Sequence, residues 1–146
     1  MIYNVEDIAN LILLCSEDKG ELMTNMKLQK MLYYQQGFHL AYFDEPLFND
    51  DIEAWMYGPV VSRIYHKYKD AGKNGIPGDK NSSFTFENST EAALFNEVNK
   101  VYGRFSAIGL MEMTHSEKPW KSVPTCEGSI ISKTSIQSFF RTRLKK

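Results

Sequence analysis

Apolar residues recur every three or four positions along much of the chain, which is the spacing of an α-helix. Between Val5 and Glu17 this stripe predicts a first helix. Asn4 is placed to cap its N-terminus, and Gly20 is placed to end it in a left-handed turn. The stripe consists of Val5, Ile8, Leu11, Ile12 and Cys15.

The strongest helical pattern runs from Thr24 or Asn25 to about Tyr42. Its apolar positions form one wide face and its polar positions supply the other side, so we expect an amphipathic helix with a solvated flank. Pro46 and the acidic residues beside it then break the helix. The apolar face contains Leu28, Met31, Leu32, Tyr34, Phe38 and Tyr42, and the polar side contains Lys27, Lys30, Gln35 and Gln36.

The middle of the chain changes to a period of two. Residues 52–57 place apolar and polar side chains on alternate sides, which predicts a short strand. Gly58 is expected to end that strand and Pro59 to occupy the first position of a third helix, where its missing N–H costs nothing. After a loop rich in glycine and asparagine, Phe84 and Phe86 indicate a second short strand with both rings on one face.

Helical spacing returns in the last third of the chain. Asn88 or Ser89 is expected to cap a fourth helix and Ser106 a fifth. A final helix starts near Ser132, after a strand fragment at residues 130–131. With no repeat and no long linker, these elements predict one compact domain over residues 1–146. Its class is mainly α, with five to six helices and a small two- to three-stranded β element.

Composition narrows the possible classes of function. The chain is 42% hydrophobic and 13% aromatic, enough for a real core, and its net charge of −1 argues against nucleic acid as the main partner. Cys15 and Cys126 form no CxxC motif, which indicates reduced thiols. The sequence shows no signal-peptide pattern and no apolar run near the roughly 20 residues of a membrane helix. We therefore expect a cytoplasmic protein without a membrane partner.

The run "THSEKPW" at residues 114–120 most resembles a chemical site. His115 and Glu117 form an H-x-E pair, but the cysteine ligands of a zinc deaminase are missing, so we expect no metal and no cofactor. A helix that ends at His115, followed by Pro119 and a packed Trp120, explains the same residues. A small hydrolase-type enzyme that uses His115 and Glu117 stays open as an alternative.

Two charged segments have simple interpretations. The acidic residues around position 51 could hold Mg²⁺, but without a paired lysine or histidine at motif spacing we interpret them as a solvated turn. The basic residues at the end of the chain suit a solvated helix terminus, and a DNA-binding autoregulator remains a second alternative. The acidic residues are Asp50, Asp51 and Glu53, and the basic ones are Arg141, Arg143, Lys145 and Lys146.

Large amphipathic side chains are numerous for a domain of this size. They cannot all be interior at the surface-to-volume ratio of a small domain. Tyrosine, tryptophan and methionine are also enriched at interaction surfaces. This surplus favours a protein-binding module over an enzyme. It consists of Tyr33, Tyr34, Tyr42, Trp55, Tyr57, Tyr65, Tyr68 and Trp120.

Three stretches together resemble a known family. They are "MTNMKLQKMLYYQQGFHLA", "PLFNDDIEAWMYGPVVSRIYHKY" and "LMEMTHSEKPWKS", in the order and at the approximate intervals of the SocA-like, Panacea-domain antitoxins, a phage-associated family. The resemblance spans about residues 5 to 123, and the final helix lies outside it. The matching residues are Lys27, Leu28, Gln29, Tyr33, Tyr34, Trp55, Tyr57, Gly58, Pro59, His115 and Trp120.

The resemblance implies a cytoplasmic antitoxin without enzymatic activity that neutralises a co-encoded toxin by direct contact. Members of the family pair with unrelated toxins, and some act as adaptors for proteolysis. The implied partners are therefore a cognate toxin and, for an adaptor, a protease. The candidate partner-binding residues are Lys27, Tyr33, Tyr34, Trp55, Tyr57, Gly58, Pro59, His115 and Trp120.

Overall fold

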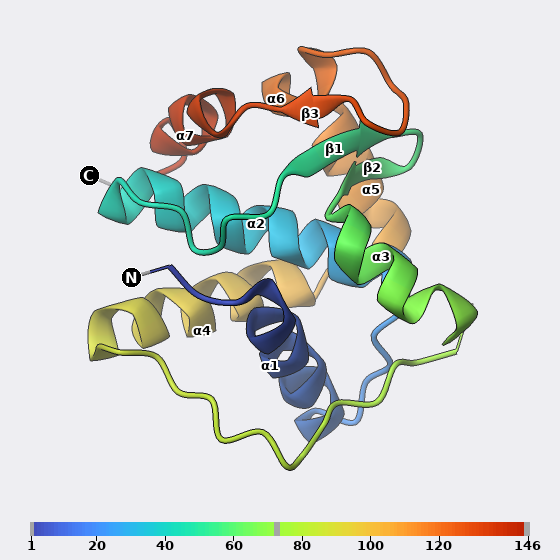
Figure 1. Cartoon of the computed structure of the whole chain (residues 1–146), viewed down its shortest axis with the longest axis vertical. Coiled ribbons are helices and arrows are strands. Elements are labelled where there is room, and N and C mark those ends of the chain that lie inside the picture. Colours follow the sequence, from blue (N-terminus) through green and yellow to red (C-terminus); the bar gives the residue numbers. More distant parts are fainter. Residues whose placement is uncertain (1, 72–73, 145–146) are drawn as a thin grey trace.

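The structure is a computed structural model that describes residues 2–71 and 74–144. It confirms a mainly helical domain with a small antiparallel sheet (Figure 1). In chain order the elements are α1 (Val5–Asp18), α2 (Asn25–Phe43), β1 (Ile52–Trp55), β2 (Gly58–Val60), α3 (Ser62–Tyr68), the 3-10 helix η1 (Lys69–Ala71), α4 (Ser89–Gly103), α5 (Ala107–His115), α6 (Lys118–Lys121), β3 (Ile130–Ile131) and α7 (Lys133–Arg141).

Helix starts follow the local sequence closely. At five of them a polar side chain accepts a hydrogen bond from a backbone N–H of the first turn, which satisfies a donor that the helix itself leaves unpaired. These predicted helix starts are therefore confirmed. Across the described residues, no helix combines the length and the apolar character needed to cross a bilayer. The capping residues are Asn4, Thr24, Asn88, Ser106 and Ser132.

Helix α2 is the centre of the molecule (Figure 1). It contacts α1, α3, α4, α5, α7 and β2, so nearly its whole circumference is covered. The prediction of a solvated flank on this helix is wrong. Lys30, Gln35 and Gln36 are buried, because neighbouring elements pack against the polar side as well as the apolar one.

The buried glutamines of α2 bind the backbone of the segments around them. The side-chain amide of Gln36 donates to the carbonyl of Phe48 at 2.8 Å and accepts from the N–H of Leu47 at 2.7 Å. Gln35 donates to the carbonyl of Phe95, in α4, at 3.1 Å. A buried amide is tolerated only when it is paired, so these residues hold α4 and the segment that leads into β1 against the central helix.

Helix α7 packs directly on α2 through a glycine. A Cβ atom at Gly37 would lie 2.2 Å from the ring of Phe140, far inside van der Waals contact. The missing side chain therefore lets the Phe140 ring lie against the α2 backbone, and Phe140 and Ile136 are buried as the sequence predicts.

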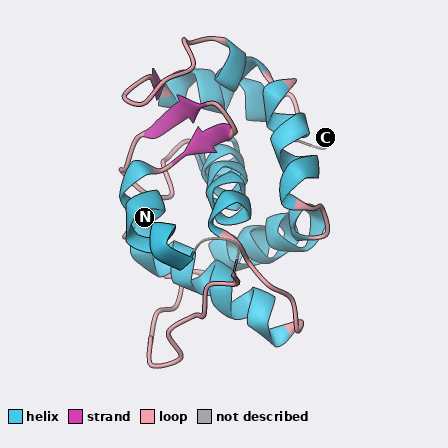
Figure 2. Cartoon of the chain, turned by 90° about the vertical axis from the view of Figure 1, so that its right-hand side faces the viewer, coloured by secondary structure: helices cyan, strands magenta, loops and turns pink. Residues whose placement is uncertain are grey.

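The sheet has the strand order β2-β1-β3, with both pairs antiparallel, and lies at one edge of the molecule (Figure 2). The prediction that Pro59 opens a helix is wrong, because residues 58–60 form β2 and α3 begins at Ser62. Pro59 pairs with Ala54 on an edge strand, where its lack of an N–H is tolerated. Gly58 has φ +118°, a conformation that favours glycine at the end of the hairpin.

The second predicted strand, at Phe84 and Phe86, is also wrong. This segment is a loop, and both rings meet the ring of Tyr3 edge to face, with centroid distances of 5.5 and 5.2 Å. The alternation that suggested a strand therefore reflects packing of both rings on Tyr3, with Phe86 also against Phe95, and no strand in the described part of the chain pairs with this segment.

Candidate functional site

The run at residues 114–120 joins α5 and α6 to the sheet. His115 is the last residue of α5, and its ring stacks on Trp120 with a centroid distance of 4.0 Å. The indole N–H of Trp120 donates to the carbonyl of Trp55, in β1, at 2.8 Å. The packing interpretation of His115 and Trp120 accounts for these contacts, which hold the β1–β2 hairpin in place.

Glu117 belongs to a different group of contacts, with two tyrosines of α2. Its two carboxylate oxygens accept hydrogen bonds from the hydroxyls of Tyr33 and Tyr34, each at 2.9 Å. Burial raises the pKa of Glu117, and burial together with this carboxylate raises the pKa of both tyrosines. His115 and Glu117 thus contact separate partners, an arrangement that offers no shared acid–base geometry.

The acidic turn is paired with basic side chains. Asp50 binds Arg63 at 3.0 Å, and Asp51 lies 3.4 Å from Lys133. Within residues 2–71 and 74–144, no group of three histidine, cysteine or carboxylate side chains is arranged to hold a metal ion. The predicted solvated turn is wrong for Glu53, which lies in β1 and accepts hydrogen bonds from the side chain of Trp55 and the N–H of Gly128, whereas Asp50 and Asp51 precede that strand.

The basic end of the chain also contacts the protein itself. Arg141 forms an ion pair with Asp44, and the guanidinium of Arg143 lies 4.8 Å from the ring centroid of Phe139. Lys145 and Lys146 lie outside the described residues. The ion pair of Arg141 therefore joins α7 to the residue that ends α2, whereas Arg143 contacts a ring of α7 itself.

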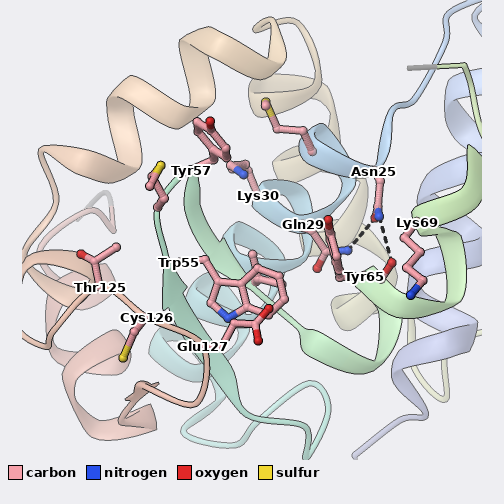
Figure 3. Close-up of a pocket in the computed structure, with 13 residues that line it drawn as sticks. Asn25, Gln29, Lys30, Trp55, Tyr57, Tyr65, Lys69, Thr125, Cys126 and Glu127 are labelled. Atoms are coloured by element: carbon pink, nitrogen blue, oxygen red, sulfur yellow. Dashed lines mark hydrogen bonds between the residues drawn. The ribbon is translucent and has the colours of Figure 1, made fainter. Parts of the chain in front are cut away.

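A pocket of about 760 Å³ opens beside the hairpin (Figure 3). Its walls come from the start of α2, from the β1–β2 hairpin, from α3 with η1, and from the loop that follows α6. This volume falls in the range of pockets that bind a ligand or a partner's side chains. The lining residues are Asn25, Met26, Gln29, Lys30, Trp55, Met56, Tyr57, Val60, Tyr65, Lys69, Thr125, Cys126 and Glu127.

The loop wall of the pocket is fixed to β1. The backbone N–H of Cys126 donates to the carbonyl of Ala54 at 2.9 Å, and Ala54 in turn donates to the carbonyl of Ser129 at 2.8 Å. The side chain of Glu53 accepts from the N–H of Gly128 at 2.7 Å. The pocket is therefore formed before any partner arrives.

The amides that line the pocket are already in use. Gln29 donates to Asn25 at 2.9 Å and accepts from the N–H of Val61 at 2.9 Å. Asn25 donates to the carbonyl of Tyr65 at 3.0 Å, as the dashed lines in Figure 3 show. These groups connect α2 to α3 and to Val61, the residue between β2 and α3, so their role is to hold the pocket together.

Lys30 is the exception in this pocket. Its side chain is only 1% exposed, and burial lowers its pKa to about 8. It reaches the pocket past Gly58, where a Cβ atom would lie 2.9 Å from the Cε of Lys30, so the glycine leaves room for the lysine. Among the described residues, Lys30 has neither a hydrogen-bond acceptor nor an ion-pair partner.

The structure separates the candidate partner-binding residues into three groups. Trp55 and Tyr57 line the pocket, and Tyr57 is 57% exposed. Lys27 is half-buried and donates to the carbonyl of Gly103 at 2.6 Å, away from the pocket. The others support the fold: Tyr33, Tyr34, Gly58 and Pro59 are buried, and His115 and Trp120 stack on each other.

Lys30 was not among the predicted site residues. The sequence places it on the polar side of α2, together with Lys27, Gln35 and Gln36. Its burial results from elements in other parts of the chain that pack against this side of the helix, so no local signal could have found it.

Comparison with known proteins places the β1–β2 hairpin and most of the residues that line the pocket inside a recognised domain. A family model described as "Antitoxin SocA-like, Panacea domain" matches residues 28–121, more than half of the chain. Over 69 residues the chain is 35% identical to a curated relative, "Antitoxin SocA" of Caulobacter vibrioides (strain NA1000 / CB15N). This match covers 47% of the chain and 37% of that protein, so it spans little more than a third of the relative's length. No solved structure matches at a comparable level. The resemblance found in the sequence is confirmed: the chain belongs to the SocA-like antitoxin family with the Panacea domain.

Proposed function

We propose that this chain is an antitoxin that neutralises a co-encoded toxin by direct contact, through the pocket beside the β1–β2 hairpin. The observation that carries the proposal is a preformed pocket whose exposed aromatic and methionine rim, at the hairpin tip, lies in the region matched by the antitoxin family model. Met56 is 67% exposed and Tyr57 57% exposed, on adjacent positions of the hairpin tip.

The rim has the chemistry of an interaction surface. Tyrosine, tryptophan and methionine are enriched where partners meet, because they bury much area with few polar groups. The hairpin is held by its sheet partners and by the hydrogen bond from Trp120 to Trp55. A partner therefore has little loop entropy to overcome, which favours tight contact.

The same features support binding over catalysis. His115 and Glu117 have separate contacts, and the pocket is lined by other residues. We propose direct contact as the mode of neutralisation, with delivery of the toxin to a protease as the competing mode. The two modes differ in a measurable way, because an adaptor lowers the amount of toxin in the cell while an inhibitory partner leaves it unchanged.

Co-expression with the product of the neighbouring gene tests the proposal. We expect that product to arrest growth alone and this chain to restore growth, with the amount of toxin unchanged on an immunoblot. Tyr57→Ala should weaken rescue, since truncation of an interface hot spot costs about 2 kcal/mol or more. Tyr42→Ala is the matched control, because Tyr42 is 58% exposed and lies near the opposite end of α2 from the pocket. A harmless neighbour product, or toxicity that persists with the chain present, contradicts the proposal.

A further inference from the structure

Lys30 is a buried charge for which the described residues supply no partner. Several other buried ionisable groups are paired: a carboxylate oxygen of Glu91 lies 2.6 Å from the Nε2 of His39, and Glu117 accepts hydrogen bonds from two tyrosines. The buried Nε2 of His115 also lacks a hydrogen-bond partner among the described residues, but His115 stacks on Trp120 and does not line the pocket. Uncompensated burial of an ammonium group is unfavourable, so such groups are normally paired or functional. Because Lys30 is buried, unpaired among the described residues and faces the pocket, it is marked as a group kept for something outside the chain.

The surroundings of Lys30 suit a single negative charge. The Asn25 and Gln29 amides are committed to internal hydrogen bonds, which leaves Lys30 as the unpaired buried donor of the pocket among the residues described. One ammonium group balances one carboxylate. A phosphate would bring further charged oxygens against Met26, Met56 and Val60, and the pocket's second lysine, Lys69, is exposed at the rim.

The rest of the pocket suits a polypeptide. A volume of about 760 Å³ is far larger than one carboxyl group, so the acid would arrive with its neighbours. Trp55, Met56 and Val60 supply apolar surface for those neighbours. Low polarity around the pair also strengthens the attraction between ammonium and carboxylate.

We propose that the pocket binds an acidic segment of the toxin, in which the carboxylate of an Asp or Glu pairs with Lys30 while flanking apolar side chains cover Trp55 and Tyr57. This inference rests on the proposed function for the identity of the partner. Its chemistry can be tested without a toxin.

The test is selection of random displayed peptides on the whole chain, followed by affinity measurements with the selected peptides. We expect the selected peptides to share an Asp or Glu flanked by apolar residues. Lys30→Met should weaken their binding by about 30-fold or more, since loss of one member of a desolvated charge pair affects affinity strongly. Lys69→Met is the matched control. It removes an exposed lysine at the pocket rim, so peptide affinity should fall by about threefold or less.

Replacing the Asp or Glu of the peptide with its amide should weaken binding to the wild type as much as Lys30→Met does. The same replacement should change binding to the Lys30→Met variant little, because the charge pair is already lost there. Thermal unfolding of Lys30→Met checks that the variant is folded. Failure to select specific peptides, enrichment without acidic residues, or equal affinity for Lys30→Met overturns the inference. Equally tight binding of free glutarate also overturns it, because the source would then be a small acid.

The pH dependence gives a second readout. Because the pKa of Lys30 is about 8 in the free chain, affinity for the peptide should be constant below that pH and should fall by up to about tenfold per pH unit above it. Lys30→Arg stays charged and should remove this fall; if the fall persists in Lys30→Arg, another group is responsible and the inference fails. The other titratable groups that face the pocket, common to both proteins, are Tyr57, Tyr65, Lys69, Cys126 and Glu127.

The growth assay separates the two proposals. Equal rescue by Lys30→Met and wild type overturns the role of Lys30 and leaves the antitoxin proposal intact. Failure of the wild type to rescue overturns the antitoxin proposal, while the peptide experiment still decides whether Lys30 binds a carboxylate.

Discussion

Replacing Lys30 with methionine should stabilise the folded chain. The ammonium of Lys30 loses its hydration on folding and gains no partner among the described residues, and its pKa falls from 10.5 to about 8. A change of this size corresponds to roughly 3 kcal/mol of unfavourable free energy at neutral pH. Methionine has a similar unbranched length and carries no charge, so we expect Lys30→Met to raise the free energy of unfolding by up to about 3 kcal/mol.

The effect has a defined pH window. Between about pH 8 and pH 10.5 the unfolded chain binds more protons at this lysine than the folded chain. The wild type should therefore gain stability as pH rises through that window, and the full penalty should apply below it. Lys30→Met lacks this titration, so the difference between the two proteins should be largest at neutral pH and should shrink towards pH 10.

Urea unfolding followed by circular dichroism at several pH values measures both effects. Lys27→Met is the matched control, because Lys27 donates a hydrogen bond to the carbonyl of Gly103 at 2.6 Å and should lose about 1 kcal/mol on substitution. If Lys30→Met is less stable than the wild type at neutral pH, and the difference does not change with pH, Lys30 has a partner and the reasoning is wrong.

Substitutions at three further sites, with a control at Gly103, test the packing of the helices and the hairpin by the same unfolding measurement. Gly37→Ala should lower the free energy of unfolding by about 1 to 3 kcal/mol, because the added methyl group would overlap the ring of Phe140. Gly103→Ala is the control, since its methyl group has room and should change stability by about 0.5 kcal/mol or less. Equal effects of the two substitutions would contradict the close packing at Gly37. Glu117→Ala should lower the free energy of unfolding by about 3 kcal/mol because it leaves two tyrosine hydroxyls unpaired, and Glu117→Gln should lower it less. Since burial raises the pKa of Glu117, the wild type should lose stability relative to Glu117→Gln as pH rises above the ordinary carboxyl range. The opposite dependence on pH would refute the raised pKa. Trp120→Phe should cost about 1 kcal/mol through loss of the hydrogen bond to the sheet, and no loss would show that this bond does not hold the hairpin.

Local signals in the sequence predicted much of this fold. The caps at Asn4, Thr24 and Asn88 depend on side chains bonding to amides two or three residues away, so they can be read without knowing the tertiary structure. The same holds for the strand fragment at residues 130–131, which carries two β-branched residues after a turn.

The errors arise where distant segments decide the outcome. Pro59 suits both a helix start and an edge strand, and the choice is made by pairing with Ala54 across the hairpin. Phe84 and Phe86 alternate like a strand, but no neighbouring strand pairs with them in the described structure, and they pack on Tyr3 instead. Period-two spacing shows only which side chains share a face.

The candidate site was predictable only in part. Trp55 and Tyr57 were expected at a binding surface, and both line the pocket. Lys30 was missed because burial on all sides of α2 depends on five other helices closing around it, which no window of sequence reports. Tyr33 and Tyr34 show the reverse, since the surplus of aromatic residues suggested surface positions, whereas their hydroxyls bind a buried carboxylate.

Calorimetric titration of the purified chain with the purified product of the neighbouring gene tests the central claim most directly. We expect a stable complex whose affinity falls strongly with Tyr57→Ala and Lys30→Met and stays unchanged with Tyr42→Ala. Absence of heat and of a complex with the wild type, or equal affinity for all four proteins, would contradict neutralisation through this pocket.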